Sequence, residues 1–138
     1  MHIKSLLSLL LFFALLVPAT ASAKRKNKQP LRVACIGNSI TYGFNVEDRE
    51  RNAYPAQLQA MLGAGYEVGN FGRSGATLLR RGHRPYFAQE EFRKAMDFKA
   101  DIAVIHLGIN DTDPRNWPHY RDEFVGDYHA LLDSLRSA

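Results

Sequence analysis

The alternation of short apolar runs with longer amphipathic segments most strongly constrains the fold of this 138-residue chain. Three runs have the length and the residue types of β-strands, and a helical pattern follows each of them. These runs are "LRVACIG" (31–37), "YEVGNFG" (66–72) and "DIAVIHLG" (101–108). Repeated strand–helix units with apolar strands predict an α/β fold, in which helices cover both faces of a parallel sheet. We expect 101–108 to be the most buried strand.

Helical periodicity occupies the segments between and after these runs. Apolar residues three or four positions apart recur in 52–65, in 85–98 and in 116–138. Such spacing predicts helices with one apolar face toward the sheet. The last segment carries a single long stripe, formed by Trp117, Tyr120, Phe124, Tyr128, Leu131 and Leu135.

The first 23 residues stand apart from this pattern. His2 and Lys4 precede an apolar run, and an Ala-Ser-Ala sequence ends at Ala23. This order is typical of a cleavable secretory signal peptide, and the run is shorter than the about 20 residues that span a membrane. The basic segment 24–30 is predicted to be a disordered lead-in, which leaves 31–138 for the folded domain. We therefore expect a secreted or periplasmic protein without a stable membrane anchor.

Charge and cysteine content exclude some classes of function. The basic lead-in accounts for most of the net charge of +4, and no aromatic platform accompanies it. We therefore expect no nucleic-acid partner. The single cysteine, Cys35, lies inside the first apolar run, where a thiol usually packs as a small buried apolar side chain.

Unusual polar residues follow each predicted strand at its carboxyl end. The first strand ends in Gly-Asn-Ser (37–39), the second in "NFGRSG" (70–75) and the third in "GIND" (108–111). Ligands of parallel sheets bind outside the carboxyl ends of the strands. The three ends should therefore contribute to one common site.

These ends offer the parts of a serine hydrolase site. Ser39 would be the nucleophile on a strand-to-helix turn, with an oxyanion hole formed by its own amide, the Gly75 amide and the Asn110 side chain. Taken singly, each residue has another interpretation, because serine often caps a helix and glycine often serves a turn. The arrangement of all three at strand ends favours the catalytic interpretation.

The same residues resemble the SGNH or GDSL hydrolase family. The matching blocks are "IGNSITYG", "NFGRSGAT" and "HLGIND". The longer pattern "NFGRSGATLLRRGHRPYF" looks like the secreted bacterial sialate O-acetylesterase-like branch. The resemblance implies a three-layer, flavodoxin-like fold and ester hydrolysis, often of acetyl groups on sugars. It also implies Ser39, Gly75 and Asn110 as catalytic residues, and no metal or other cofactor.

The chain departs from the family pattern in two places. Asn38 stands where many members have Asp, a position that is not the triad acid. The family's Asp-x-x-His block, which follows two further strands, has no counterpart: no histidine here has an acidic residue three positions earlier. We expect His106 to pack against a helix, His129 to lie on the surface and His83 to lie in a loop. The outer edge of strand 101–108, internal in the family, would then be unpaired.

The leading prediction is therefore a partial SGNH hydrolase domain that lacks its C-terminal strands and its catalytic His/Asp pair. It would act on a small-molecule or glycan ester. The alternative is a glycan-binding module of the same fold that has lost catalysis. Arg73, Arg81 and Trp117 are the candidate substrate contacts. In the binding module, Arg80 and Arg84 join them as residues that could hold an anionic or planar sugar, and the alternative for these arginines is a solvated surface loop. A flavin or nucleotide binder is disfavoured, because no phosphate loop follows the first strand.

Overall fold

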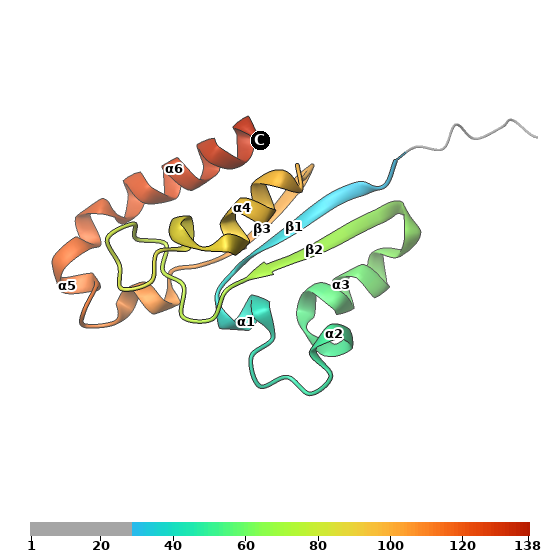
Figure 1. Ribbon diagram of the computed structural model, residues 1–138, viewed down its shortest axis with the longest axis horizontal. Coiled ribbons are helices and arrows are strands. Elements are labelled where there is room, and N and C mark those ends of the chain that lie inside the picture. Colours follow the sequence, from blue (N-terminus) through green and yellow to red (C-terminus); the bar gives the residue numbers. More distant parts are fainter. Residues whose placement is uncertain (1–28) are drawn as a thin grey trace, which may run out of the picture.

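The computed structural model describes residues 29–138, which form a parallel three-stranded sheet flanked by helices (Figure 1). The strands are β1 (Leu31–Gly37), β2 (Tyr66–Gly72) and β3 (Ile102–His106), in the spatial order β2-β1-β3. Gly37 pairs with Gly72 on one side and with His106 on the other. The three carboxyl ends therefore meet at one edge of the sheet, and the predicted α/β class is confirmed.

Helical elements connect the strands. Between β1 and β2 lie α1 (Ser39–Tyr42), α2 (Arg49–Asn52), α3 (Tyr54–Leu62) and the 3₁₀ turn η1 (Gly63–Gly65). Between β2 and β3 lie η2 (Tyr86–Ala88) and α4 (Glu90–Asp97). After β3 come η3 (Ile109–Thr112), α5 (Trp117–Tyr120), η4 (Arg121–Glu123) and α6 (Phe124–Ser137).

Two of the predicted helices are interrupted. The segment 85–98 divides into η2 and α4, because Gln89 has an extended backbone (φ −88°, ψ 155°). The segment 116–138 divides at Tyr120, which leaves the helical region at φ −132° and ψ 2°. The apolar spacing continues across both breaks, so periodicity alone did not predict them.

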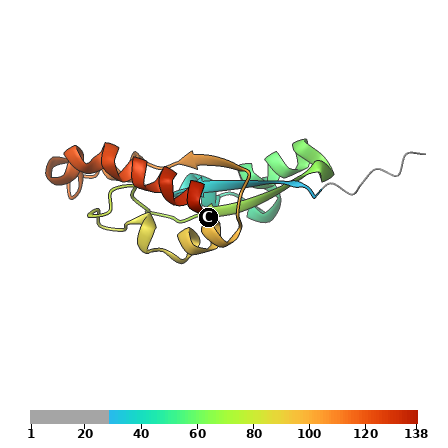
Figure 2. The same ribbon diagram turned by 90° about the horizontal axis from the view of Figure 1, so that it is seen from above.

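Helices lie on both sides of the sheet, as Figure 2 shows for α3 and α4. Ala34 and Ile36 of β1 form a buried cluster with Ala95 of α4, and Leu135 of α6 packs against it. On the other face, the Gln59 side chain of α3 accepts the backbone N–H of Val68 at 2.8 Å. The core therefore lies on β1, which has its last five residues buried.

The predicted deep burial of strand 101–108 is wrong. Ile102 and Val104 are 44% and 37% exposed. β3 is one of the two outer strands of the described sheet, and α3 packs against the other one, β2. His106 is likewise exposed, so its predicted packing against a helix is also wrong. The expectation of an unpaired outer edge is confirmed for residues 29–138.

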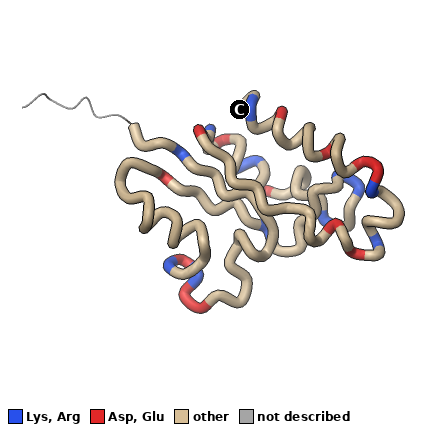
Figure 3. The backbone as a smooth tube through the Cα atoms, turned by 180° about the vertical axis from the view of Figure 1, so that it is seen from behind, with Lys and Arg blue, Asp and Glu red and all other residues tan. Residues whose placement is uncertain are grey.

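Two predictions about the N-terminus are left open by the structure. The signal peptide predicted at 1–23 lies outside the described residues, and only residues 29 and 30 of the lead-in are described. Within 29–138, the helices are too short or too polar to cross a membrane. Most charged residues of this part lie in helices and loops rather than in the strands (Figure 3).

Candidate active site

Backbone hydrogen bonds join the three strand ends. The Asn38 amide, just after β1, donates to the carbonyl of His106 at the end of β3 (3.3 Å). The Arg73 amide, just after β2, donates to the Gly37 carbonyl at the end of β1 (2.8 Å). The loops that carry the predicted catalytic residues therefore leave the sheet side by side.

Ser39 is the first residue of α1, and Asn38 is the residue that caps this helix. The Asn38 Oδ1 accepts the Ile40 amide at 3.0 Å, and Asn38 is fully buried. The Ser39 side chain makes no hydrogen bond with other residues of 29–138 and is only partly buried. Because another side chain serves as the cap, the hydroxyl of Ser39 is available for chemistry.

Gly75 lies in the turn after β2 with a left-handed backbone (φ +78°). This conformation suits glycine, because a Cβ would introduce strain. The neighbouring Ala76 amide donates to the Arg73 carbonyl at 3.1 Å, whereas the Gly75 amide has no acceptor among residues 29–138. A free backbone N–H at a strand end is the kind of donor that an oxyanion hole uses.

Asn110 lies in η3 and connects the third strand end to the second. Its Nδ2 donates to the carbonyl of Ala76 at 2.8 Å, next to Gly75. A primary amide carries two N–H groups, so the second remains for a substrate oxygen. The structure therefore brings the loops of Ser39, Gly75 and Asn110 to one edge of the sheet, while their catalytic roles stay predictions.

Comparison with known proteins agrees with this geometry. Residues 35–138 match the GDSL-like Lipase/Acylhydrolase family. The chain belongs to this family. An acetylxylan esterase of Xylanibacter ruminicola is 49% identical over 106 residues, which are 77% of this chain and 22% of that protein.

Two solved structures share the fold of this GDSL-family chain. Both are of the esterase AlinE4, described as an SGNH-hydrolase family esterase, and one is of a variant. Each has a TM-score of 0.60 and 22% identity, covering 80% of this chain and 55% of the other. The chain thus spans between about a fifth and about half of the length of these relatives.

Two buried polar residues that sequence reasoning left without a role hold the GDSL-family loops in place. The Asp111 carboxylate accepts the amides of Leu78 (2.9 Å) and Leu79 (2.6 Å). The Asn116 amide group accepts the His83 backbone N–H (2.9 Å) and donates to the Asn110 carbonyl (2.9 Å). In the sequence, Asp111 and Asn116 are recognisable only as short polar residues that follow the third strand. That pattern does not predict which backbone groups they bind.

The predicted sugar contacts fall in two places. The Arg81 Nη1 lies 2.9 Å from the Glu123 carboxylate. The Trp117 ring packs edge-on against the Phe124 ring, with 5.6 Å between the ring centroids. Arg81 and Trp117 are therefore both in contact with the chain where η4 meets α6. Arg73 instead pairs with Glu91 at 3.3 Å and lines a pocket beside Ser74.

No histidine among residues 29–138 forms a hydrogen bond with Ser39. The His83 Nδ1 lies 2.9 Å from the Asn116 Nδ2, so it accepts and His83 carries its proton on Nε2. His119 and His129 are exposed, as predicted for His129.

The Arg115 side chain and amide hold the pKa of Asp113 well below its usual range, so this carboxylate is engaged by Arg115.

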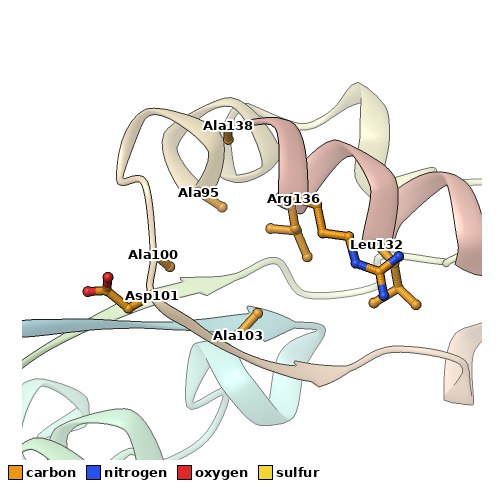
Figure 4. Close-up of a pocket in the computed structure, with 8 residues that line it drawn as sticks. Ala95, Ala100, Asp101, Ala103, Leu132, Arg136 and Ala138 are labelled. Atoms are coloured by element: carbon orange, nitrogen blue, oxygen red, sulfur yellow. The ribbon is translucent and has the colours of Figure 1, made fainter.

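A second pocket lies away from this site. It has a volume of about 320 Å³ and opens among α4, α6 and the amino end of β3 (Figure 4). Ala95, Ala103 and Leu132 make its lining largely apolar. Ligands of parallel sheets bind at the opposite, carboxyl edge, so we do not assign this pocket to the candidate active site. No cluster of potential metal ligands occurs in 29–138.

Proposed function

We propose that this chain carries the nucleophile and oxyanion-hole part of a serine esterase that removes acyl groups, acetyl above all, from carbohydrate. The joining of three strand ends by hydrogen bonds is the observation that carries the proposal. The acetylxylan esterase relative supports an acetylated sugar as substrate. The pattern "NFGRSGATLLRRGHRPYF" supports the sialate O-acetylesterase-like branch.

In the proposed reaction, the Ser39 Oγ attacks the ester carbonyl carbon and loses its proton to a base. The negative charge that develops on the carbonyl oxygen is stabilised by the amides of Ser39 and Gly75 and by the Asn110 Nδ2. The sugar alcohol leaves with that proton, and an acyl-enzyme remains. Water then attacks the acyl carbon, which releases the acid and restores the Ser39 hydroxyl.

The base and its acid partner are proposed to come from polypeptide beyond residue 138. The resemblance implies an Asp-x-x-His block, and the relatives are considerably longer than this chain. Within 29–138, the histidines form no hydrogen bond with Ser39. Extending the chain with the downstream coding sequence tests this point, and non-homologous sequence without Asp-x-x-His there would contradict it.

Acetate release from acetylated xylan by the extended protein tests the esterase proposal. Ser39→Ala should lower the rate at least about 10³-fold, because the oxyanion hole alone retains little catalysis. Ser137→Ala is the matched control, since its hydroxyl only donates to the Ser134 carbonyl on α6. Equal rates for Ser39→Ala and the control would refute Ser39 as the nucleophile.

A glycan-binding module is the second candidate, favoured by the observation that no histidine in 29–138 forms a hydrogen bond with Ser39. A serine-directed phosphonate probe distinguishes the two candidates in the extended protein. Labelling of Ser39 supports the esterase, whereas sugar binding without labelling supports the module.

Export through a signal peptide at 1–23 is also proposed, and mass spectrometry of the exported protein should show a chain that begins near Lys24.

A further inference from the structure

A pocket beside Gly75 combines aromatic and cationic side chains. It has a volume of about 260 Å³ and is lined by Tyr42, Phe44, Arg73, Ser74 and Arg84. Ser74 immediately precedes the predicted oxyanion glycine. We propose that this pocket binds a carboxylate on the sugar that carries the ester, with Arg84 as the residue that recognises it. This inference rests on the proposed function, which places the ester next to Gly75.

The Arg84 side chain is held against the turn that contains Gly75. Its Nη1 donates to the Ser74 carbonyl at 3.1 Å. A Cβ at Gly75 would lie only 3.5 Å from the Arg84 Cδ. The Arg84 guanidinium group is therefore held next to Gly75, whose amide is the predicted oxyanion donor. Its remaining N–H groups are available for a ligand.

The charge of Arg84 is uncompensated among residues 29–138. Arg73, on the same pocket, pairs with Glu91 at 3.3 Å. Arg84 has no carboxylate within 4.0 Å in this part of the chain, and it is exposed. The pocket thus has one neutralised arginine and one free arginine, which makes an anion the complementary ligand.

The other lining residues fit the same ligand. The Ser74 Oγ is buried and has no hydrogen-bond partner in 29–138, although buried hydroxyls normally have one. It can donate to a carboxylate oxygen. Phe44 is 60% exposed, so its aromatic surface is available to contact the apolar face of a sugar ring. The Arg49 guanidinium group covers one face of the Tyr42 ring, at 4.1 Å from the ring centroid.

The inference is tested by measuring how tightly acetylated sugars bind to the Ser39→Ala variant of the extended protein, which cannot hydrolyse them. The probes are mono-O-acetylated glucuronic acid and mono-O-acetylated glucose, which differ only in a carboxylate against a hydroxymethyl group. Calorimetry should show about three- to fivefold tighter binding of the acetylated glucuronic acid. Sodium chloride should reduce the difference by screening it.

Variants of Arg84 identify the residue responsible. Arg84→Gln should abolish the preference, and Arg84→Lys should keep part of it, because lysine retains the charge without the fork of donors. Arg93→Gln is the control, since Arg93 is an exposed arginine of α4 without an ion pair in 29–138. Circular dichroism confirms that each variant is folded.

Equal binding of the two probes, or a preference that survives Arg84→Gln, would overturn the inference. The result is independent of the esterase test. A carboxylate preference in a protein whose Ser39 never reacts with the phosphonate would retain the subsite and reject the esterase. Ester hydrolysis without the preference would do the reverse.

Discussion

The carboxylate of Asp111 accepts the backbone N–H of Leu79 at 2.6 Å, across 32 positions of sequence. It also accepts the Leu78 N–H at 2.9 Å, and Asp111 is fully buried. Both donors belong to the loop after β2 that contains Gly75, while Asp111 follows Asn110 directly. One buried carboxylate therefore couples the loops of two predicted oxyanion donors.

Asp111→Asn should lower the free energy of unfolding by about 2–3 kcal/mol. The substitution places an amide N–H against a backbone N–H and leaves a buried donor without an acceptor. Urea denaturation of the chain measures the change. Asp122→Asn is the control, because the Asp122 side chain is 98% exposed. Unfolding midpoints that coincide for the two variants would contradict this role of Asp111.

Gly75→Ala should lower the rate at which the phosphonate labels Ser39 in the extended protein, by about tenfold. Alanine disfavours the left-handed backbone of Gly75 (φ +78°) by about 1 kcal/mol and so shifts its amide. Gly63→Ala is the control for backbone strain away from the site, since Gly63 also has a positive φ (+70°) and free space for a Cβ but lies after α3. Both variants should lose stability, and Gly63→Ala should lose at least as much, because the Gly63 backbone (φ +70°, ψ −165°) lies in a region that is nearly restricted to glycine. A labelling rate that falls equally in both would indicate a general effect of strain.

Asn38→Ala should destabilise the chain by about 1 kcal/mol through loss of the cap on α1. Because Ser39 begins that helix, its labelling by the phosphonate should also slow. Asn38→Asp keeps an oxygen acceptor for the Ile40 amide and should restore the labelling rate in part. Asn52→Ala, at an exposed asparagine of α2, is the control. Unchanged labelling in Asn38→Ala would show that the cap does not position Ser39.

Tyr54 should ionise near pH 12 in the folded protein. Burial raises the pKa of Tyr54 to about 12, and the hydrogen bond with the Thr41 hydroxyl (3.1 Å) opposes this shift in part. The unfolded chain, with an ordinary tyrosine pKa of about 10, loses this proton first. The neutral Tyr54 side chain therefore makes its whole contribution to the free energy of unfolding below about pH 10. This contribution should be lost as the pH rises from about 10 to about 12.

Rapid-mixing measurements of phenolate absorbance can follow this ionisation. The difference between the wild-type and Tyr54→Phe titrations should have its midpoint near pH 12 in buffer and near pH 10 in concentrated urea. A folded-state midpoint near pH 10 would show that Tyr54 is not desolvated.

Much of the framework could be predicted because it depends on local sequence. The strands 31–37 and 66–72 have the predicted bounds, since each apolar run ends at a glycine that closes the strand. Cys35 is buried as expected for its place in β1, and burial raises the pKa of its thiol. The spacing of strand ends also identified which loops meet, because parallel strands share one carboxyl edge.

The sequence by itself determined the strand–helix order, the family and the three loops that converge at the sheet edge. Tertiary structure alone decided that Asn38 rather than Ser39 caps α1, that Asp111 anchors the Gly75 loop, and that β3 is exposed. The physical reason is that burial and hydrogen-bond partners depend on neighbours distant in sequence. An apolar run indicates how well a strand tolerates burial, whereas only the packed sheet determines which strands lie at its edges with a neighbour on one side.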